Sequence, residues 1–257
     1  MPTWNADLYL QYANERTQPS IDLTTRIQLE NPRQIIDLGC GPGNSTAVLR
    51  GRWPAANIVG LDNSPAMIAK ARADFPDGAW ELAEIPAWRP DRRFDLVFSN
   101  AALHWVPDHA TVIPHLFAQV APGGALAVQM PAHLESPVHR AMLEIADDPE
   151  WQARTAPAKG LVHVETPEFY YDLLCRAAAR IDLWVTTYEH VMAAPEAIIE
   201  WIRGTGLRPF LEALSTDDQR ARFTTKLLER AAVEYPSRSD GKVIFPFRRL
   251  FFVAYCA

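Results

Sequence analysis

Residues 37–45 read DLGCGPGNS, with three glycines at alternate positions; they follow an apolar run at 34–38 and lead into a predicted helix at 45–52. Glycine reaches backbone conformations that other residues avoid, and it lets a ligand come close to the main chain. The N-terminus of the helix that follows presents unpaired backbone N–H groups. This stretch predicts a buried parallel strand, a tight turn and a helix, with a ligand site at the turn.

Two acidic residues flank this turn and narrow the choice of ligand. Asp62 lies nineteen residues past Gly43, at the end of a second apolar run at 57–61, where a carboxylate can accept hydrogen bonds from both ribose hydroxyls. Asp37 precedes the first glycine by two residues, where it would repel a pyrophosphate but suit an ammonium group. The third glycine comes one place earlier than in the dinucleotide pattern, and Asn44 fills the expected position. A nucleoside with an ammonium group and no phosphate fits, and S-adenosylmethionine is such a molecule.

Strands and helices alternate outward from the turn. Ser64 and Pro65 supply the N-cap and the first residue of a second helix. This alternation predicts a doubly wound parallel α/β sheet. Two stretches, 131–166 and 191–247, are too long for simple connections and are expected to form extra structure. Further strands are predicted at 79–83, 94–98, 125–130, 181–188 and 250–255, and further helices at 109–120, 167–179, 195–204 and 216–234.

Composition sets bounds on the class of protein. The chain has 257 residues, 48% of them hydrophobic, and a net charge of −6, which suits one large globular domain and opposes binding to nucleic acid. No apolar stretch reaches the ~18 residues that span a bilayer, and the first residues do not resemble a signal peptide. Three cysteines without CxxC spacing indicate neither a disulfide framework nor a zinc site. We therefore expect a cytoplasmic protein without a metal. We also expect a monomer, although no feature of the composition determines the oligomeric state.

Polar residues at the ends of other predicted strands complete a nucleoside site. Glu84 follows the third strand, where it can meet the adenine amino group while Ile85 covers a ring face. Asn100 and Ala101 follow the fourth strand, where the reactive end of the ligand is expected. Met67, on the second helix, is placed to pack against adenine, although a helical methionine also serves as ordinary core.

The runs IDLGCGPGNST, VGLDNSPAMI, FDLVFSNAALHWVPD and VAPGGALAVQMP resemble the motifs of the class I S-adenosylmethionine-dependent methyltransferases. Together they cover about residues 33–131. The resemblance implies a Rossmann-like, doubly wound sheet of seven strands with the last one antiparallel. It also implies a single domain over 1–257, with the cofactor half at about 1–131 and lid or substrate insertions at about 131–166 and 191–247.

The same resemblance assigns residues to the cofactor. One position departs from the family pattern, because Glu84 stands where the family often has Asp. Arg16 is expected to close over the cofactor or to pair with its carboxylate. The implied cofactor-binding residues are Asp37, Gly39, Gly41, Asn44, Asp62, Asn63, Met67, Glu84, Ile85, Asn100, Ala101 and Trp105.

The resemblance continues through YYDLL, DLWVTTYEH, AIIEWIRGTGLRPFL and RRLFFVA, and there it implies methyl transfer to a carboxylate of a small polycarboxylate. A carboxyl group with a pKa of about 4 is already ionised at neutral pH, so the site needs no general acid or base and its residues act by position only. Arginine suits carboxylates best. If the last strand is antiparallel and begins at Arg249, it starts at the sheet edge where ligands bind. The expected acceptor-binding residues are His104, Tyr171, Tyr188, Arg203, Arg208 and Arg249.

Three other functions remain open on the sequence. A methyltransferase acting on another acceptor, such as a quinone ring carbon or a different small acid, would share the cofactor half. A nicotinamide-dependent dehydrogenase would use a similar glycine turn, although the early Gly43 and the acidic Asp37 speak against it. A protein that binds S-adenosylmethionine without catalysis would keep the same binding residues.

Overall fold

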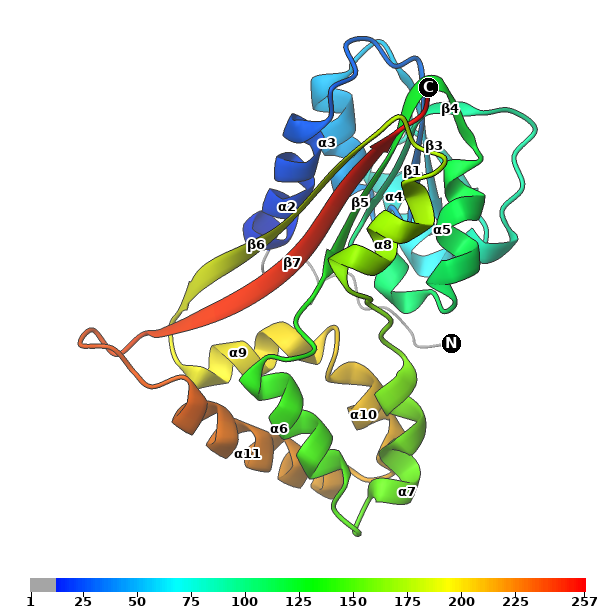
Figure 1. Cartoon of the computed structure of the whole chain (residues 1–257). Coiled ribbons are helices and arrows are strands. Elements are labelled where there is room, and N and C mark those ends of the chain that lie inside the picture. The colour runs from blue at the N-terminus through cyan, green and yellow to red at the C-terminus, as the bar shows by residue number, and fades with distance from the viewer. Residues whose placement is uncertain (1–12) are drawn as a thin grey trace. The chain divides into compact units, whose positions relative to one another are not determined.

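The computed structural model describes residues 13–257, with side chains from Thr17 onward (Figure 1). These residues form two compact units. The sheet unit comprises 13–131, 163–186 and 250–257, and the helical unit comprises 132–162 and 187–249. Each unit has a buried apolar core of its own.

Seven strands form the sheet, in the order β3-β2-β1-β4-β5-β7-β6. The pairs β1·β2, β1·β4, β2·β3 and β4·β5 are parallel, and the last strand is antiparallel. This is the doubly wound α/β fold that the sequence predicts. The strands are β1 (Gln34–Leu38), β2 (Asn57–Asp62), β3 (Ala79–Leu82), β4 (Phe94–Asn100), β5 (Val120–Pro131), β6 (Arg180–Met192) and β7 (Val243–Tyr255).

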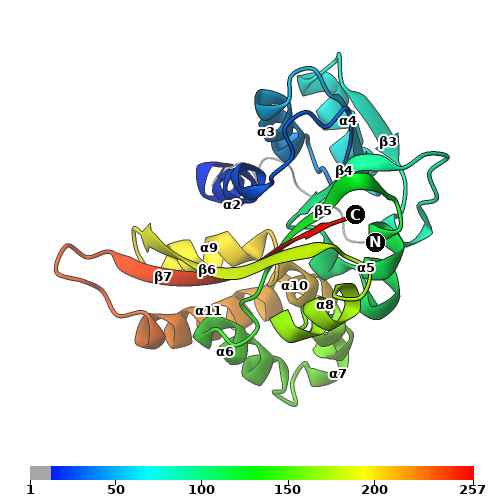
Figure 2. The ribbon, with the colours of Figure 1, turned by 45° about the horizontal axis from the view of Figure 1, so that its top comes forward.

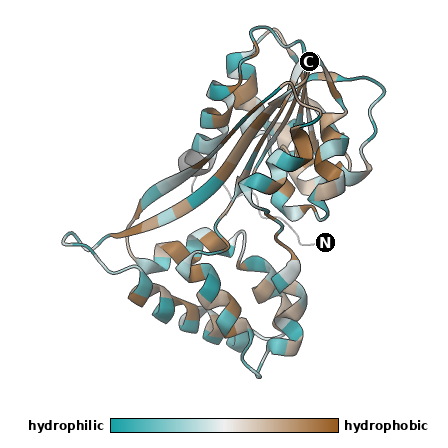
Figure 3. Ribbon diagram, in the orientation of Figure 1, coloured by the Kyte–Doolittle hydropathy of each residue, from teal (hydrophilic) through white to brown (hydrophobic). Residues whose placement is uncertain are grey.

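Helices cover both faces of the sheet in the sheet unit. Helices α2 and α3 pack together on one face, and α5 and α8 on the other (Figures 1 and 2). The central strands are therefore shielded from water on both sides, and they are predominantly apolar (Figure 3). The elements are α2 (Ala13–Arg26), α3 (Asn44–Arg52), α4 (Pro65–Asp74), α5 (His109–Phe117) and α8 (Pro167–Leu174), with 3₁₀ turns η1 (Ile85–Ala87) and η2 (Leu103–Trp105).

The N-terminal strands and the start of α4 agree with the sequence prediction. Ser64 caps α4 by accepting a hydrogen bond from the backbone N–H of Met67 at 3.4 Å, and Pro65 is the first helical residue. The predicted helix over 109–120 is too long, because α5 ends at Phe117 and residues 120–124 belong to β5.

Gly124 allows a close approach within the sheet rather than ending a helix. A Cβ on Gly124 would lie 2.5 Å from the backbone oxygen of Asp95, in the neighbouring strand β4. The register of β4 and β5 also shifts between Phe94 and Leu96. A residue with a side chain at position 124 would therefore force the two strands apart.

The last strand begins earlier than the sequence predicts. β7 starts at Val243, not at residue 250, so Arg249 lies inside the strand rather than at its beginning. The first half of β7 alternates buried and exposed residues and includes Pro246, whereas the continuous apolar run starts only at Leu250. A prediction from apolar runs detects the second half only.

The two long stretches between strands contain helices. In the helical unit α11 packs against α6 and α9, and α10 packs against α7. Phe223, Leu227 and Ala231 form the buried stripe of α11 at spacings of four residues. The elements are α6 (Pro137–Ala146), α7 (Gln152–Thr155), η3 (Ala156–Gly160), α9 (Pro195–Arg203), α10 (Arg208–Ala213) and α11 (Asp217–Glu234).

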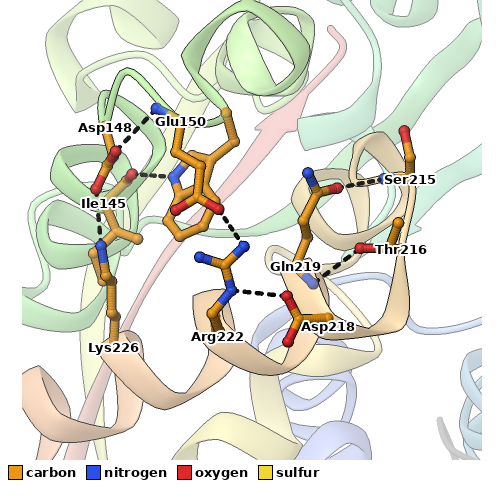
Figure 4. Close-up of polar contacts among 10 residues, drawn as sticks. Ile145, Asp148, Glu150, Ser215, Thr216, Asp218, Gln219, Arg222 and Lys226 are labelled. Carbon is orange, nitrogen blue, oxygen red and sulfur yellow. Dashed lines mark hydrogen bonds and ion pairs between the residues drawn. The ribbon is translucent and has the colours of Figure 1, made fainter.

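Ion pairs attach the segment after α6 to α11 (Figure 4). Lys226 donates to Asp148 at 2.8 Å, and Arg222 pairs with Glu150. The ammonium group of Lys226 also lies 4.9 Å from the centroid of the buried Trp151 ring. These contacts hold α11 against the segment that follows α6.

Membrane-spanning helices and disulfide bonds are both absent from the part of the chain that the structure describes. Over residues 13–257 no helix combines the length and the apolar character needed to cross a bilayer. Cys40, Cys175 and Cys256 are all free.

Candidate functional site

The glycine turn after β1 combines left-handed backbone with one open position. Gly39, Gly41 and Gly43 have φ values of +71°, +55° and +99°. A Cβ on Gly39 would overlap the Cβ of Ala102, and a Cβ on Gly43 would lie 2.8 Å from the Trp80 ring. A Cβ on Gly41 would meet nothing within 4 Å. Gly41 is therefore the position where a ligand can reach the bare backbone.

Asp62, at the end of β2, is held in a fixed orientation beside this turn. Its Oδ2 accepts a hydrogen bond from the N–H of Gly41 at 3.0 Å, and its Oδ1 accepts one from the N–H of Ser64 at 2.8 Å. Burial raises the pKa of Asp62, although these backbone hydrogen bonds act in the opposite direction. Each oxygen keeps a lone pair, so the carboxylate can still accept two hydroxyl groups.

Asp37 lies completely buried at the base of the turn. Its Oδ2 accepts hydrogen bonds from Ser45 Oγ at 2.7 Å and Thr46 Oγ1 at 2.6 Å, and its Oδ1 has no hydrogen-bond partner within residues 13–257. Burial raises the pKa of Asp37 to about 6; the two hydroxyls oppose this shift and the charge of Asp62 adds to it. A carboxylate in this setting gains from a cationic partner.

The residues predicted to lie near adenine follow β2 and β3. Asn63 Nδ2 donates to Glu84 Oε2 at 3.1 Å, so the ends of the two strands are linked. Glu84 is exposed, whereas Met67 and Ile85 are 4% and 7% exposed. Asn44 is the first residue of α3 and is partly exposed.

The ends of β4 and β5 bring Asn100 beside Gln129. The two residues are register partners, and the N–H of Ala101 donates to the Gln129 carbonyl at 3.0 Å. Ala101 has a φ of +53°, which is rare for a residue with a side chain and marks a strained turn. The rings of His104 and Trp105 follow in η2, with centroids 4.9 Å apart.

Gln129 is a candidate residue that the sequence pattern does not single out. It is fully buried, and neither atom of its side-chain amide has a hydrogen-bond partner within the described chain. Helix α2 contacts β5, and on it Ser20 and Thr24 are buried with hydroxyls that are likewise unpaired there. Such groups each cost about 1–3 kcal/mol unless a ligand or water satisfies them. The available signal was a lone glutamine in the apolar run ALAVQM.

Replacing Gln129 with methionine is expected to stabilise the ligand-free protein by about 1 kcal/mol, because an apolar side chain of similar length removes two unsatisfied polar atoms. The same change is expected to lower kcat/KM by about tenfold or more if the amide contacts a ligand. Urea denaturation and steady-state kinetics measure the two effects. In the control Q119M, which removes the 3.2 Å hydrogen bond from Gln119 to the His115 carbonyl, no stability gain is expected. A destabilised but fully active Q129M would make Gln129 a structural residue.

Among the arginines predicted to hold the acceptor, Arg249 is the most deeply placed. It is 4% exposed, and its guanidinium carbon lies 4.7 Å from the centroid of Phe247 and 5.7 Å from that of Tyr188. The structure thus brings Arg249 and Tyr188 together within the helical unit.

The other two arginines have carboxylate neighbours. Burial lowers the pKa of Arg208, while Glu212 Oε1, 3.8 Å from its Nε, acts in the opposite direction. Arg203 forms a 3.2 Å pair with Glu200 on the surface of α9. Surface pairs of this kind contribute little to stability, so Arg203 can exchange its partner at small cost.

The remaining predicted residues are placed as follows. Tyr171 is 52% exposed on α8. The buried tyrosine of that helix is instead Tyr170, whose hydroxyl lies 2.6 Å from His109 Nδ1 and accepts from the N–H of Glu165 at 3.1 Å. The side chain of Arg16 lies outside those that the structure describes. Within the described chain no three histidine, cysteine or acidic residues are grouped to hold a metal ion.

Comparisons with known proteins identify the family to which this fold and turn belong. A family model described as a methyltransferase domain matches residues 11–208. The chain therefore belongs to the methyltransferase family, and it is an enzyme of that kind. It is 47% identical over 254 residues to a protein of Azoarcus sp. and 48% identical over 257 residues to one of Methylobacterium radiotolerans, covering at least 98% of each chain. Both relatives are named trans-aconitate 2-methyltransferase.

A solved structure supports the same fold. The crystal structure of a protein described as a methyltransferase from Bacillus halodurans aligns with 93% of this chain and 98% of its own, with a TM-score of 0.59 at 12% identity. At that identity the likeness concerns the fold alone.

Proposed function

We propose that the protein transfers the methyl group of S-adenosylmethionine to a carboxylate of trans-aconitate, giving the monomethyl ester and S-adenosylhomocysteine. The support for this acceptor is the name shared by relatives that match the chain from end to end. A buried arginine in a chain of net charge −6 agrees with an anionic acceptor, because a carboxylate needs a local cation in such a protein.

The residues of the sheet unit suit S-adenosylmethionine. The open position at Gly41 admits a ligand to the backbone. Oδ1 of Asp37, which has no hydrogen-bond partner among the described residues, suits an ammonium group, and Asp62 is oriented to accept the ribose hydroxyls. Asn63, Glu84, Met67 and Ile85 are assigned to the adenine side.

The cofactor supplies an electrophilic methyl group. The residues of this chain act by binding and orientation, because an acceptor carboxylate is already ionised at neutral pH and needs no base. Asn100 and Trp105 are assigned to the reactive end of the donor, and Arg249, Arg208 and Tyr188 to the acceptor. Holding two reactants in a productive geometry can contribute roughly 7–11 kcal/mol in favourable cases.

The proposal is tested by incubating the protein with isotopically labelled S-adenosylmethionine and a panel of acids: trans-aconitate, cis-aconitate, citrate and an aromatic hydroxy acid. We expect label in a product whose mass is that of monomethyl trans-aconitate, formed with a higher kcat/KM than any product of the other acids. Turnover of another acid with a higher kcat/KM would assign a different acceptor. Binding of S-adenosylhomocysteine without turnover of any acid would favour the non-catalytic alternative.

The proposal extends to the setting of the enzyme. Three free cysteines agree with a reducing compartment, and we assign the protein to the cytoplasm as a monomer that uses no metal. Gel filtration with light scattering tests the monomer, for which we expect a mass near 28.8 kDa. Activity unchanged by a chelator is expected as well.

A further inference from the structure

A histidine shortly after β5 lies close to the candidate acceptor residues. His133 is two residues beyond the end of β5 at Pro131. Its ring stacks on Phe247, with centroids 4.7 Å apart and 25° between the planes, and His139 meets it edge-on at 5.7 Å. In the sequence His133 is a lone histidine after a strand, which carries no distinguishing pattern, so only the structure brings it to notice.

His133 has a hydrogen-bonding atom without a use in the fold. Its Nδ1 is buried and has no partner among residues 13–257. The ring also borders a cavity of about 470 Å³, but this cavity is lined by Arg248 on the exposed face of β7 and not by Arg249. On the ring itself, Nε2 lies 3.8 Å from where a Cβ on Gly206 would stand. An unsatisfied ring nitrogen in such a place costs stability, and a bound ligand can recover that cost.

The surroundings of His133 are suited to a carboxylate. Arg249 lies 4.7 Å from the same Phe247 ring, and His190 lies 6.3 Å from it. Among the described residues no carboxylate accepts a hydrogen bond from Nδ1 of His133, although Glu135 and Glu234 line the cavity that the ring borders on its other side. Burial lowers the pKa of His133 to about 3, and the charges of His139 and Arg249 act in the same direction. The imidazole is therefore neutral near pH 7, with one N–H to donate.

We propose that Nδ1 of His133 donates a hydrogen bond to a carboxylate of the acceptor, beside the carboxylate bound by Arg249. This inference rests on the proposed function and assigns it a specificity residue. A neutral donor orients a second carboxylate without adding the charge that another arginine would bring next to Arg249. The enzyme would thereby prefer acceptors with two carboxylates at a fixed spacing over monocarboxylates.

Two substitutions separate hydrogen bonding from packing. H133F keeps a ring to stack on Phe247 and removes both nitrogens, whereas H133N places an amide nitrogen near the position of Nδ1. We expect H133F to raise the KM for trans-aconitate about 10- to 100-fold, the range of a hydrogen bond to a charged group, with the KM for S-adenosylmethionine unchanged. H133N is expected to recover most of the loss. The matched control H139F, on the neighbouring ring, is expected to leave the KM for trans-aconitate within about twofold.

The outcomes distinguish this inference from the proposed function. If the wild-type protein does not methylate trans-aconitate, both are overturned. If it does and H133F has a normal KM for trans-aconitate, only the role of His133 is overturned. Equal losses in H133F and H139F, or no recovery in H133N, would show that His133 acts through packing. Thermal melts of all variants identify any that fail to fold. If H133F does not fold, the dissociation constant of trans-aconitate from H133N decides. A constant near that of the wild type supports the hydrogen bond, and a loss of binding overturns it.

Discussion

Replacing Asp37 with asparagine is expected to abolish most of the affinity for S-adenosylmethionine and S-adenosylhomocysteine while leaving the ligand-free protein at least as stable above pH 7. The affinity falls because the charged group at the base of the turn is lost; a charged hydrogen bond contributes about 1.5–3 kcal/mol, or roughly 10- to 100-fold in Kd. Asparagine keeps an oxygen to accept from the hydroxyls of Ser45 and Thr46. Calorimetric titration with S-adenosylhomocysteine measures the change.

The pH dependence follows from the direction of the pKa shift. Burial raises the pKa of Asp37 from 3.8 to about 6 in the folded protein, so the stability associated with its protonated form is fully present below 3.8 and is lost as the pH rises through 6. The loss amounts to about 3 kcal/mol in the wild type and should be absent from D37N. The control D74N, which removes an exposed carboxylate paired with Lys70, is expected to keep the wild-type slope. Identical slopes in D37N and the wild type would contradict the assignment.

Ligand affinity should carry the opposite dependence on pH. An ammonium group binds the ionised form of Asp37, so the affinity of the wild type for S-adenosylhomocysteine is expected to fall as the pH is lowered through about 6. D37N should show a weak and nearly constant affinity over the same range. Titrations in two buffers of different ionisation enthalpy reveal the proton released when the wild type binds.

Replacing Arg249 with methionine is expected to raise the KM for trans-aconitate by at least 100-fold. Methionine fills much of the same buried space between Phe247 and Tyr188 but supplies no hydrogen bonds, and truncating one partner of a buried charge pair costs about 2–5 kcal/mol. The KM of R249K for trans-aconitate is expected to lie between those of the wild type and R249M. Lysine keeps the positive charge but lacks the planar guanidinium group, which can bind a carboxylate through two hydrogen bonds. Steady-state kinetics at saturating donor measures both variants.

The neighbouring arginine provides the control. Arg248 is exposed on the opposite face of β7, because side chains alternate along a strand. R248M is expected to leave the KM for trans-aconitate within about twofold. In R249M the Kd for S-adenosylhomocysteine should remain at its wild-type value, since the residues assigned to the donor belong to the other unit. A normal KM for trans-aconitate in R249M would remove Arg249 from the acceptor site.

The sequence predicts the turn after β1 and the start of α4 correctly because their determinants are local. The glycine spacing and the position of Asp62 fix a turn between two adjacent parallel strands, and the register of Leu38 with Leu61 in the structure confirms that the strands end together. Ser64 as a helix cap is equally local. Features of this kind depend on a few residues that are close in the chain.

The features that the sequence does not predict depend on contacts between residues that are distant in the chain. Nothing near Gln129 in the sequence shows that its amide is buried and has no partner in the described part of the chain, because α2, about a hundred residues earlier, contacts that strand. The sequence does not predict the start of β7, because residues in the first half of this strand alternate between buried and exposed and form no continuous apolar run. Whether an arginine is buried, as Arg249 is, or paired at a surface, as Arg203 is, follows from packing that periodicity does not encode.

The overlap that a Cβ on Gly39 would make with Ala102 limits how this enzyme can be redesigned. Gly39 has no side chain and Ala102 has only a methyl group. The only change that makes room for a side chain at position 39 is therefore A102G. Positions 39 and 102 therefore constrain each other, and variants that enlarge the residue at one of them while fixing the other are expected to misfold. Directed evolution toward new acceptors should instead sample both positions jointly, or leave this junction untouched and diversify the helical unit.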